Sequence, residues 1–275
     1  MAGACSPSDA SRAPEAPAAS EGPAAGPRSA SADGESDPRT DFVLGNIAFI
    51  LFHELGHAMI TEFELPVLGR EEDAVDNFAS MLLTPDNDDP KMDASILVDA
   101  MTAWFASAQL TALEDIAWWD EHGPDQQRAY QIACVLYGSK AGAYDELAEE
   151  IGLPEERRAR CEGEYQAVSS GWGQLLGPHM LDDGEAPKVR IAVSYEDGGE
   201  YAAERALLKD SELLETLAGE ISTTFRLNRQ LRMKGMKCGQ PNAFWDPGAG
   251  EITICYELLR DYGELYAQLA AAAAE

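Results

Sequence analysis

The first 39 residues lack leucine, isoleucine, valine and every aromatic residue, and alanine, proline, serine and glycine dominate them. Such a segment has too little apolar surface to offset the entropy lost on folding. We therefore expect residues 1–39 to be a disordered tether. Residues 40–275 are expected to form a single domain, with a helical part that holds the functional site at 40–182 and a sheet with further helices at 183–275.

Basic residues are also scarce. The chain has 20 Lys and Arg against 49 Asp and Glu, which gives a net charge of -29. A polyphosphate would meet repulsion instead of the basic patch that its binding needs, so the sequence excludes nucleic acid as a partner. We interpret the charge as a solvated acidic surface, which weakly favours neutral or cationic ligands.

No apolar run reaches the roughly 20 residues that a transmembrane helix needs. The best candidate, residues 42–52, is interrupted by Asn46 and predicts a buried core helix instead. Near the N-terminus, Ala2-Gly3-Ala4-Cys5 resembles the end of a bacterial lipoprotein signal, but no basic and apolar regions precede it. Either such a signal has been removed, which would make Cys5 a lipid anchor, or Cys5 is incidental; we favour the first.

Cysteines are few, and no pair has the C-x-x-C spacing of a zinc cluster. Cys238 and Cys255 are symmetric about the turn at Asp246-Pro247 and would lie nearly opposite each other in a hairpin. Cys134 and Cys161 are expected on two consecutive helices of a helical hairpin. The two pairs predict two disulfides and an extracytoplasmic location, periplasmic, cell-surface or secreted. Four buried thiols in a cytosolic protein are the alternative.

The segment His53-Glu54-Leu55-Gly56-His57 fits the H-E-x-x-H pattern. On a helix, residues i and i+4 share a face and can present two imidazoles to one zinc ion, while Glu54 can act as general base toward a water whose pKa zinc lowers to about 7. Residues 42–60 contain no proline and suit a helix, with Thr40 or Asp41 as N-cap. A core helix with two chance histidines is the alternative.

A catalytic zinc site needs a third protein ligand. The metzincin pattern would require Gly at position 60 and His at position 63, but the chain has Ile60 and Phe63, which excludes that subclass. A second helix is predicted at residues 71–83, where Glu72 and Asp76 are i and i+4 neighbours. Its apolar face comprises Val75, Phe78, Ala79 and Leu82.

This E-x-x-x-D arrangement resembles the glutamate-zincins, in which the glutamate binds zinc and the aspartate orients a ligand histidine. The resemblance implies Glu72 as the third ligand and Asp76 as the orienting residue. Glu71 is the nearest substitute for Glu72. An acidic first turn that merely complements the helix dipole is the alternative.

Motifs along most of residues 40–275 carry a wider resemblance. They are the stretch from His53 to Leu83, Trp-Asp-Glu-His at 119–122, residues 127–139, residues 238–247 and Ile-Cys-Tyr-Glu-Leu at 254–258. Together they resemble a family of bacterial zinc metallopeptidases of undefined function. The resemblance implies an α+β, mostly helical, zincin-like domain with peptidase activity.

In that family the segment corresponding to 238–258 precedes the zinc helix, so the order here looks circularly permuted, which a compact domain tolerates. Alternating apolar residues at 189–195, 231–233 and 252–256 predict a sheet late in the chain. We expect this sheet to pack on the zinc helix and to offer an edge strand to an extended peptide.

Further helices are predicted at residues 92–119 and 155–169, and the aromatic residues of the first are expected in the core. These are Trp104, Phe105, Trp118 and Trp119. Zincins also supply a donor that stabilises the oxyanion. The candidates are His122, Tyr137 and Arg128, although His122, like His179, is equally well explained as a structural histidine.

The sequence therefore predicts a peptidase that binds one Zn²⁺ through His53, His57 and Glu72 and uses Glu54 to activate water for attack on a peptide or protein substrate. An exported binding or scaffold protein with the same fold, a structural zinc and no turnover is the rival from another class.

Overall fold

The computed structural model describes residues 37–85 and 94–274, so Cys5, Met92 and nearly all of the predicted tether lie outside the described residues. The described chain has a mostly helical α+β fold, as predicted. The helices are α1 (Pro38–Phe63), α2 (Glu71–Leu82), α3 (Ser95–Leu110), α4 (Asp125–Ser139), α5 (Asp145–Glu150), α6 (Glu155–Leu176), α7 (Ala202–Asp210), α8 (Leu213–Thr224) and α9 (Tyr256–Ala272). The strands are β1 (Ala192–Tyr195), β2 (Arg232–Met236), β3 (Ala243–Asp246) and β4 (Glu251–Cys255).

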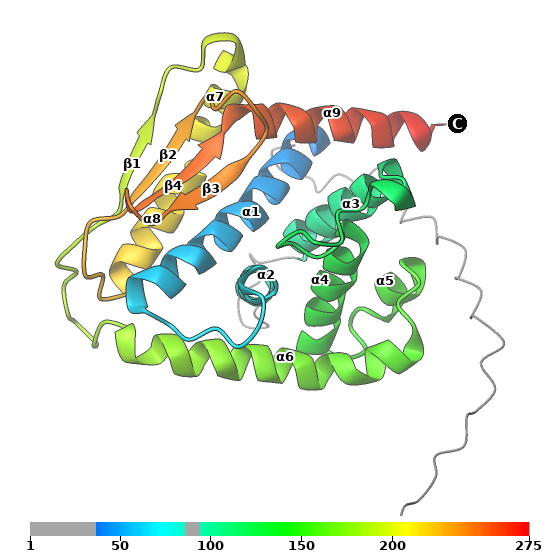
Figure 1. Ribbon diagram of the computed structural model, residues 1–275, viewed down its shortest axis with the longest axis horizontal. Coiled ribbons are helices and arrows are strands. Elements are labelled where there is room, and N and C mark those ends of the chain that lie inside the picture. The colour runs from blue at the N-terminus through cyan, green and yellow to red at the C-terminus, as the bar shows by residue number, and fades with distance from the viewer. Residues whose placement is uncertain (1–36, 86–93, 275) are drawn as a thin grey trace, which may run out of the picture.

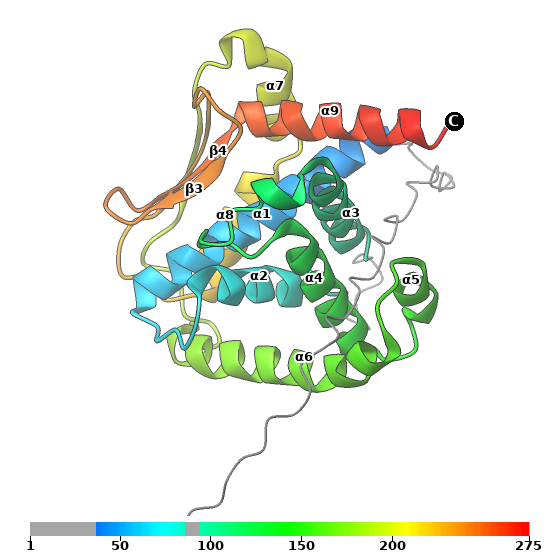
Figure 2. The ribbon, with the colours of Figure 1, turned by 45° about the vertical axis from the view of Figure 1, so that its right-hand side comes forward.

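Helix α1 lies between the sheet and helices α2 to α6 (Figures 1 and 2). Its N-cap is Asp37, whose carboxylate accepts from the backbone N–H of Thr40 at 3.3 Å, so the predicted cap at Thr40 or Asp41 was wrong. The reason is Pro38, which the first turn accepts because its missing N–H would be unpaired there anyway.

By length and composition, α1 is the one helix within residues 37–85 and 94–274 that could cross a membrane. However, 78% of its most apolar window is buried within the protein. One apolar core packs α1 against the sheet, α8 and part of α6, and a second packs Phe49 of α1 against helices α2 to α6. This burial on several sides explains the long apolar run as a core helix.

The four described strands form one sheet in the order β1-β2-β4-β3. Strands β1, β2 and β4 are parallel to one another, and β3 runs antiparallel to β4 at the edge. The sheet packs on α1 through β3 and β4, and the indole Nε1 of Trp245 donates to Thr61 Oγ1 at 3.1 Å. The predicted contact between the late sheet and the first helix is confirmed.

Two glycines allow the helices to approach α1 closely. A methyl group on Gly56 would lie 2.8 Å from the side chain of Val75 on α2, and one on Gly45 would lie 2.7 Å from a carboxylate oxygen of Asp99 on α3. The first is a contact between two carbon atoms and the second one between carbon and oxygen, and both distances are shorter than ordinary contacts between such non-bonded atoms. The small residues of α1 therefore fix how near α2 and α3 can come.

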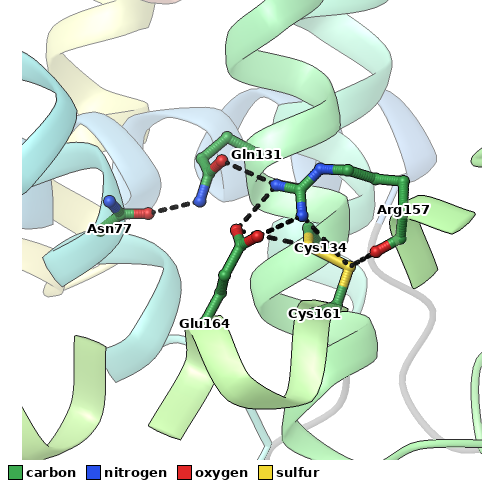
Figure 3. Close-up of a disulfide and its surroundings, with 6 residues drawn as sticks. All are labelled: Asn77, Gln131, Cys134, Arg157, Cys161 and Glu164. Atoms are coloured by element: carbon green, nitrogen blue, oxygen red, sulfur yellow. Dashed lines mark hydrogen bonds and ion pairs between the residues drawn. A yellow bond between two sulfur atoms is a disulfide. The ribbon is translucent and has the colours of Figure 1, made fainter. Parts of the chain in front are cut away.

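Both predicted disulfides are present. Cys134–Cys161 joins α4 to α6, which are not consecutive because the short α5 lies between them. Beside it, Arg157 and Glu164 pair on α6, and hydrogen bonds continue through Gln131 of α4 to Asn77 of α2 (Figure 3). The bond therefore belongs to a network that ties α2, α4 and α6 together.

Cys238–Cys255 forms for a reason that differs from the predicted one. Cys238 is not part of the hairpin, which consists of β3 and β4 alone. It lies two residues beyond β2, and the parallel pairing of β2 with β4 places Met236 opposite Cys255. The bond therefore links the segment that enters edge strand β3 to the end of β4.

The helix predicted at 92–119 ends at Leu110, and the segment 111–124, which is irregular apart from a short 3-10 helix at Leu113–Asp115, leads to α4. Phe105 is buried, as predicted, but Trp118 and Trp119 are 66% and 86% exposed. The prediction that these two tryptophans belong to the core was wrong, because the helical periodicity on which it relied stops before them. The predicted helix at 155–169 is confirmed and extends to Leu176.

Candidate metal centre

Two helices bring the H-E-x-x-H histidines and Glu72 together. His53 and His57 lie one turn apart on α1, and Glu72 lies in the first turn of α2. Gly56 faces Val75 at the contact between these helices, so the missing side chain lets α2 approach. The Nε2 atoms of His53 and His57 lie 3.1 and 3.3 Å from the same oxygen, Oε2 of Glu72.

A third imidazole reaches that oxygen as well. Nε2 of His122, in the segment 111–124, lies 3.0 Å from Glu72 Oε2. This oxygen is buried, yet none of the three nitrogens makes a well-aligned hydrogen bond to it. In a tetrahedral zinc site with bonds of roughly 2.0–2.1 Å, neighbouring ligand atoms are about 3.3 Å apart. The three nitrogen-to-oxygen distances and the missing hydrogen bond therefore fit metal ligands better than a hydrogen-bonded cluster, and the group whose ligand atoms all lie within 4.8 Å of one another comprises His53, Glu72 and His122.

Each of these histidines contacts a carboxylate with its other ring nitrogen. Nδ1 of His53 lies 2.8 Å from Asp76, and Nδ1 of His57 lies 2.7 Å from Glu71. Nδ1 of His122 lies 3.1 Å from Asp120. Such contacts orient an imidazole and leave the lone pair of Nε2 free for a metal.

Asp76 is itself held by Arg128 of α4. The guanidinium donates through Nε to Oδ2 at 2.7 Å and through Nη2 to Oδ1 at 2.8 Å, and it lies over the Trp104 ring at 3.9 Å. Although burial opposes ionisation, His53 and Arg128 lower the pKa of Asp76 to about 2. Arg128 is thus occupied in fixing Asp76, which does not suit the oxyanion-donor role predicted for it.

The charged carboxylates around the imidazoles of this cluster favour the binding of a cation. Burial disfavours a charge on His53, but the carboxylates of Asp76 and Glu72 outweigh it and raise the pKa of His53 to about 9. Burial likewise opposes ionisation of Glu72, but the neighbouring imidazoles of His122, His53 and His57 hold its pKa well below the usual range. A group of ionised carboxylates around imidazoles is a suitable environment for a divalent metal ion.

Glu54 is buried beside the two histidines of α1. Burial raises the pKa of Glu54, while the imidazoles of His53 and His57 and, to a smaller extent, the backbone N–H of Trp245 on β3 lower it. Side chains that exchange protons during catalysis work best when their pKa lies near the working pH. A buried carboxylate whose pKa is raised therefore suits a general base.

The cluster opens into a cleft of about 1770 Å³. Segment 111–124 lines one part of this cleft and β3 another, and Tyr262 of α9 also contributes to the lining. Tyr137 lies apart from it, because its hydroxyl donates to Asp145 beside a separate hollow. His179 stacks on Phe63, also away from the cluster. Neither Tyr137 nor His179 is brought to the site.

Sequence reasoning missed several residues of the site. Asp120 was part of the quoted Trp-Asp-Glu-His motif, and its position two residues before His122 is a signal that could have been used. Trp245 reaches Glu54 through its backbone, so side-chain chemistry gives no sign of it. Tyr262 stands in no motif; burial raises the pKa of its phenol.

Fold and site together define a mostly helical α+β protein with a candidate His and Glu metal centre in a cleft. The chain belongs to the DUF4344 family, described as "Putative metallopeptidase", whose model matches residues 27–176 and 195–275. The predicted family is thereby confirmed, whereas the permuted order of its segments stays a prediction. Neither the curated proteins nor the solved structures contain a match to the chain.

Proposed function

We propose that this protein is a zinc-dependent peptidase of the glutamate-zincin kind. The observation that carries the proposal is the convergence of imidazole Nε2 atoms on one buried oxygen of Glu72, with Glu54 beside them. In this proposal His53, His57 and Glu72 hold zinc, and Asp76 fixes the ring of His53. Glu71, the alternative third ligand, contacts Nδ1 of His57 instead, which supports Glu72 as the ligand.

Bound zinc would supply a water of lowered pKa and would polarise the substrate carbonyl. Glu54 takes the proton from the attacking water and passes it to the leaving amine. Burial of Glu54 favours its protonated form, which is the form that passes the proton to the leaving amine. The Trp245 indole of β3 donates to Thr61 Oγ1 of α1, which fixes β3 against the helix that carries Glu54.

Strand β3 is the proposed binding site for an extended peptide. Asn242 accepts from the Cys255 N–H, and Phe244 pairs with Thr253 in the same register. In an antiparallel ladder the alternate residues, Ala243 and Trp245, then turn their backbone groups away from β4. Both residues line the cleft, so a substrate added at this edge would lie beside Glu54.

A conservative variant tests this function. We expect Glu54→Gln to keep stoichiometric zinc but to lose about 10²–10⁴-fold in peptide cleavage, because general-base catalysis contributes that much. Glu64→Gln, at the exposed end of the same helix, is the matched control and should cleave like the wild type. If the zinc-loaded wild type cleaves nothing in a broad peptide library, the rival scaffold function with structural zinc is favoured instead.

Two disulfides in the described residues favour an oxidising compartment. We propose that the enzyme acts outside the cytoplasm, where such bonds persist. Thiol labelling of the protein after acid quenching of intact cells and denaturation, with and without prior reduction, tests this, because Cys134, Cys161 and Cys255 are fully buried in the folded protein. Labelling of Cys134, Cys161, Cys238 and Cys255 without a reductant would contradict the proposal.

A further inference from the structure

The position of His122 does not suit the role of oxyanion donor that the sequence predicted for it. As an oxyanion donor it would have to reach the substrate oxygen, which requires a donor about 2.7–3.1 Å from that oxygen and therefore outside the ligand shell. Instead, its Nε2 lies 3.0 Å from Glu72 Oε2, closer than the Nε2 atoms of His53 and His57 at 3.1 and 3.3 Å. By distance, His122 belongs with the ligands.

The surroundings of His122 also match those of the two ligand histidines. Its Nδ1 contacts the Asp120 carboxylate, and the same carboxylate oxygen accepts from the His122 backbone N–H at 2.9 Å. His53 and His57 have equivalent carboxylate partners. The rings of His122 and His53 lie roughly parallel, with centroids 5.9 Å apart and planes 21° from each other.

We infer that His122 is a fourth protein ligand of the same metal centre and closes it in this conformation. The inference rests on the metal centre of the proposed function. Catalytic zinc sites keep one position open for water or substrate, whereas sites with four protein ligands are closed. For cleavage, His122 must therefore leave the centre, so the segment 111–124 controls access to it.

The segment is suited to such a movement. The His122 side chain is 44% exposed, while those of His53 and His57 are 4% and 14% exposed. Its backbone hydrogen bonds at Asp115, Trp118 and Asp120 all go to residues of the segment itself. Leu113 and Trp118 of the same segment are exposed at the cleft, so an entering apolar substrate side chain would contact the element that carries His122.

Zinc binding tests the inference without relying on activity. X-ray absorption of the full chain with one zinc per molecule should count three imidazole ligands in the wild type and two in His122→Ala. The zinc dissociation constant, measured by chelator competition, should rise at least tenfold in His122→Ala and about tenfold in Asp120→Asn, where only the orienting carboxylate changes. His179→Ala, which removes the histidine outside the cluster, is the matched control and should bind zinc like the wild type. Two imidazoles in the wild type, with unchanged affinity in both variants, would overturn the inference.

Cleavage by zinc-saturated protein separates this inference from the proposed function. If His122 closes the centre, His122→Ala should cleave peptides at least as fast as the wild type. A loss of about 10²–10³-fold with unchanged zinc affinity would instead identify an oxyanion donor outside the ligand shell. Three imidazoles in the wild type, with no cleavage by either protein, would support the fourth ligand and refute the peptidase.

Discussion

Replacing Gly56 by alanine tests whether the contact between α1 and α2 positions Glu72. The new methyl group would lie 2.8 Å from Cβ and Cγ1 of Val75 and 3.1 Å from Cδ1 of Phe78. Carbon atoms in contact are normally about 3.5–4.0 Å apart, so α2 must move by roughly 1 Å. Glu72 lies one turn before Val75 on this helix and would move with it.

Two effects of Gly56→Ala on stability oppose each other. Overpacking in a dense core costs about 1–3 kcal/mol, while alanine in a helix interior gains about 0.5–1 kcal/mol over glycine. The expected net loss in the free energy of unfolding is therefore about 0.5–2 kcal/mol. Metal affinity should suffer more, because metal–ligand distances tolerate only about 0.2 Å.

The measurements are urea unfolding of the zinc-free protein and chelator competition for zinc affinity. Gly163→Ala on α6 is the control, because no atom outside the adjoining residues and backbone of its own helix lies within 4 Å of the added methyl group. We expect this control to gain about 0.5–1 kcal/mol and to bind zinc normally. Wild-type zinc affinity in Gly56→Ala would refute the view that this glycine positions Glu72.

Two further predictions concern the cysteine-containing segments. The buried carboxylate of Glu257 accepts from the backbone N–H groups of Cys238 and Gly239 at 3.1 and 2.7 Å. Although burial opposes ionisation, its own backbone N–H and these two donors hold the pKa of Glu257 below its ordinary value of 4.5. The ionised Glu257 carboxylate therefore stabilises the folded protein above that pH, and this stabilisation is lost as the pH falls. Glu257→Gln should lower the free energy of unfolding by about 2 kcal/mol at pH 7 and by much less near pH 3. An equal loss at both pH values would contradict this. Removing the Cys134–Cys161 bond by a double substitution to alanine should cost about 3.5 kcal/mol, estimated from the loop that its sequence separation of 27 closes. A reductant should then destabilise the double variant less than the wild type. A double variant as stable as the wild type would refute the estimate.

Much of the local structure could be predicted from short-range patterns. The helix with His53 and His57, the helix with Glu72, and the alternating strands all appear where apolar periodicity placed them. The failures occurred where periodicity stops. Trp118 and Trp119 follow the end of α3 and are exposed, and no residue pattern distinguishes an apolar segment beside a cleft from one in a core.

The site was predictable only in part, for a related reason. The spacing of His53 and His57 is fixed by a single helix, so the sequence alone identified that pair. Glu72 was inferred from a second motif, but its distance from the histidines depends on how closely α1 and α2 pack. His122 was predicted as a candidate oxyanion donor, but its distance from the other site residues could not be predicted, because it lies in a segment without regular periodicity.

The sequence by itself therefore determined where several helices and strands form, which cysteines pair, and which residue types make up the candidate centre. These depend on backbone periodicity and local spacing, which neighbouring residues set. Only the tertiary structure decided which nitrogen atoms meet at Glu72, that β3 is the edge strand beside Glu54, and that Nε2 of His122 lies beside Glu72 together with those of His53 and His57. Those arrangements depend on contacts between segments far apart in the chain, and packing at residues such as Gly56 determines them.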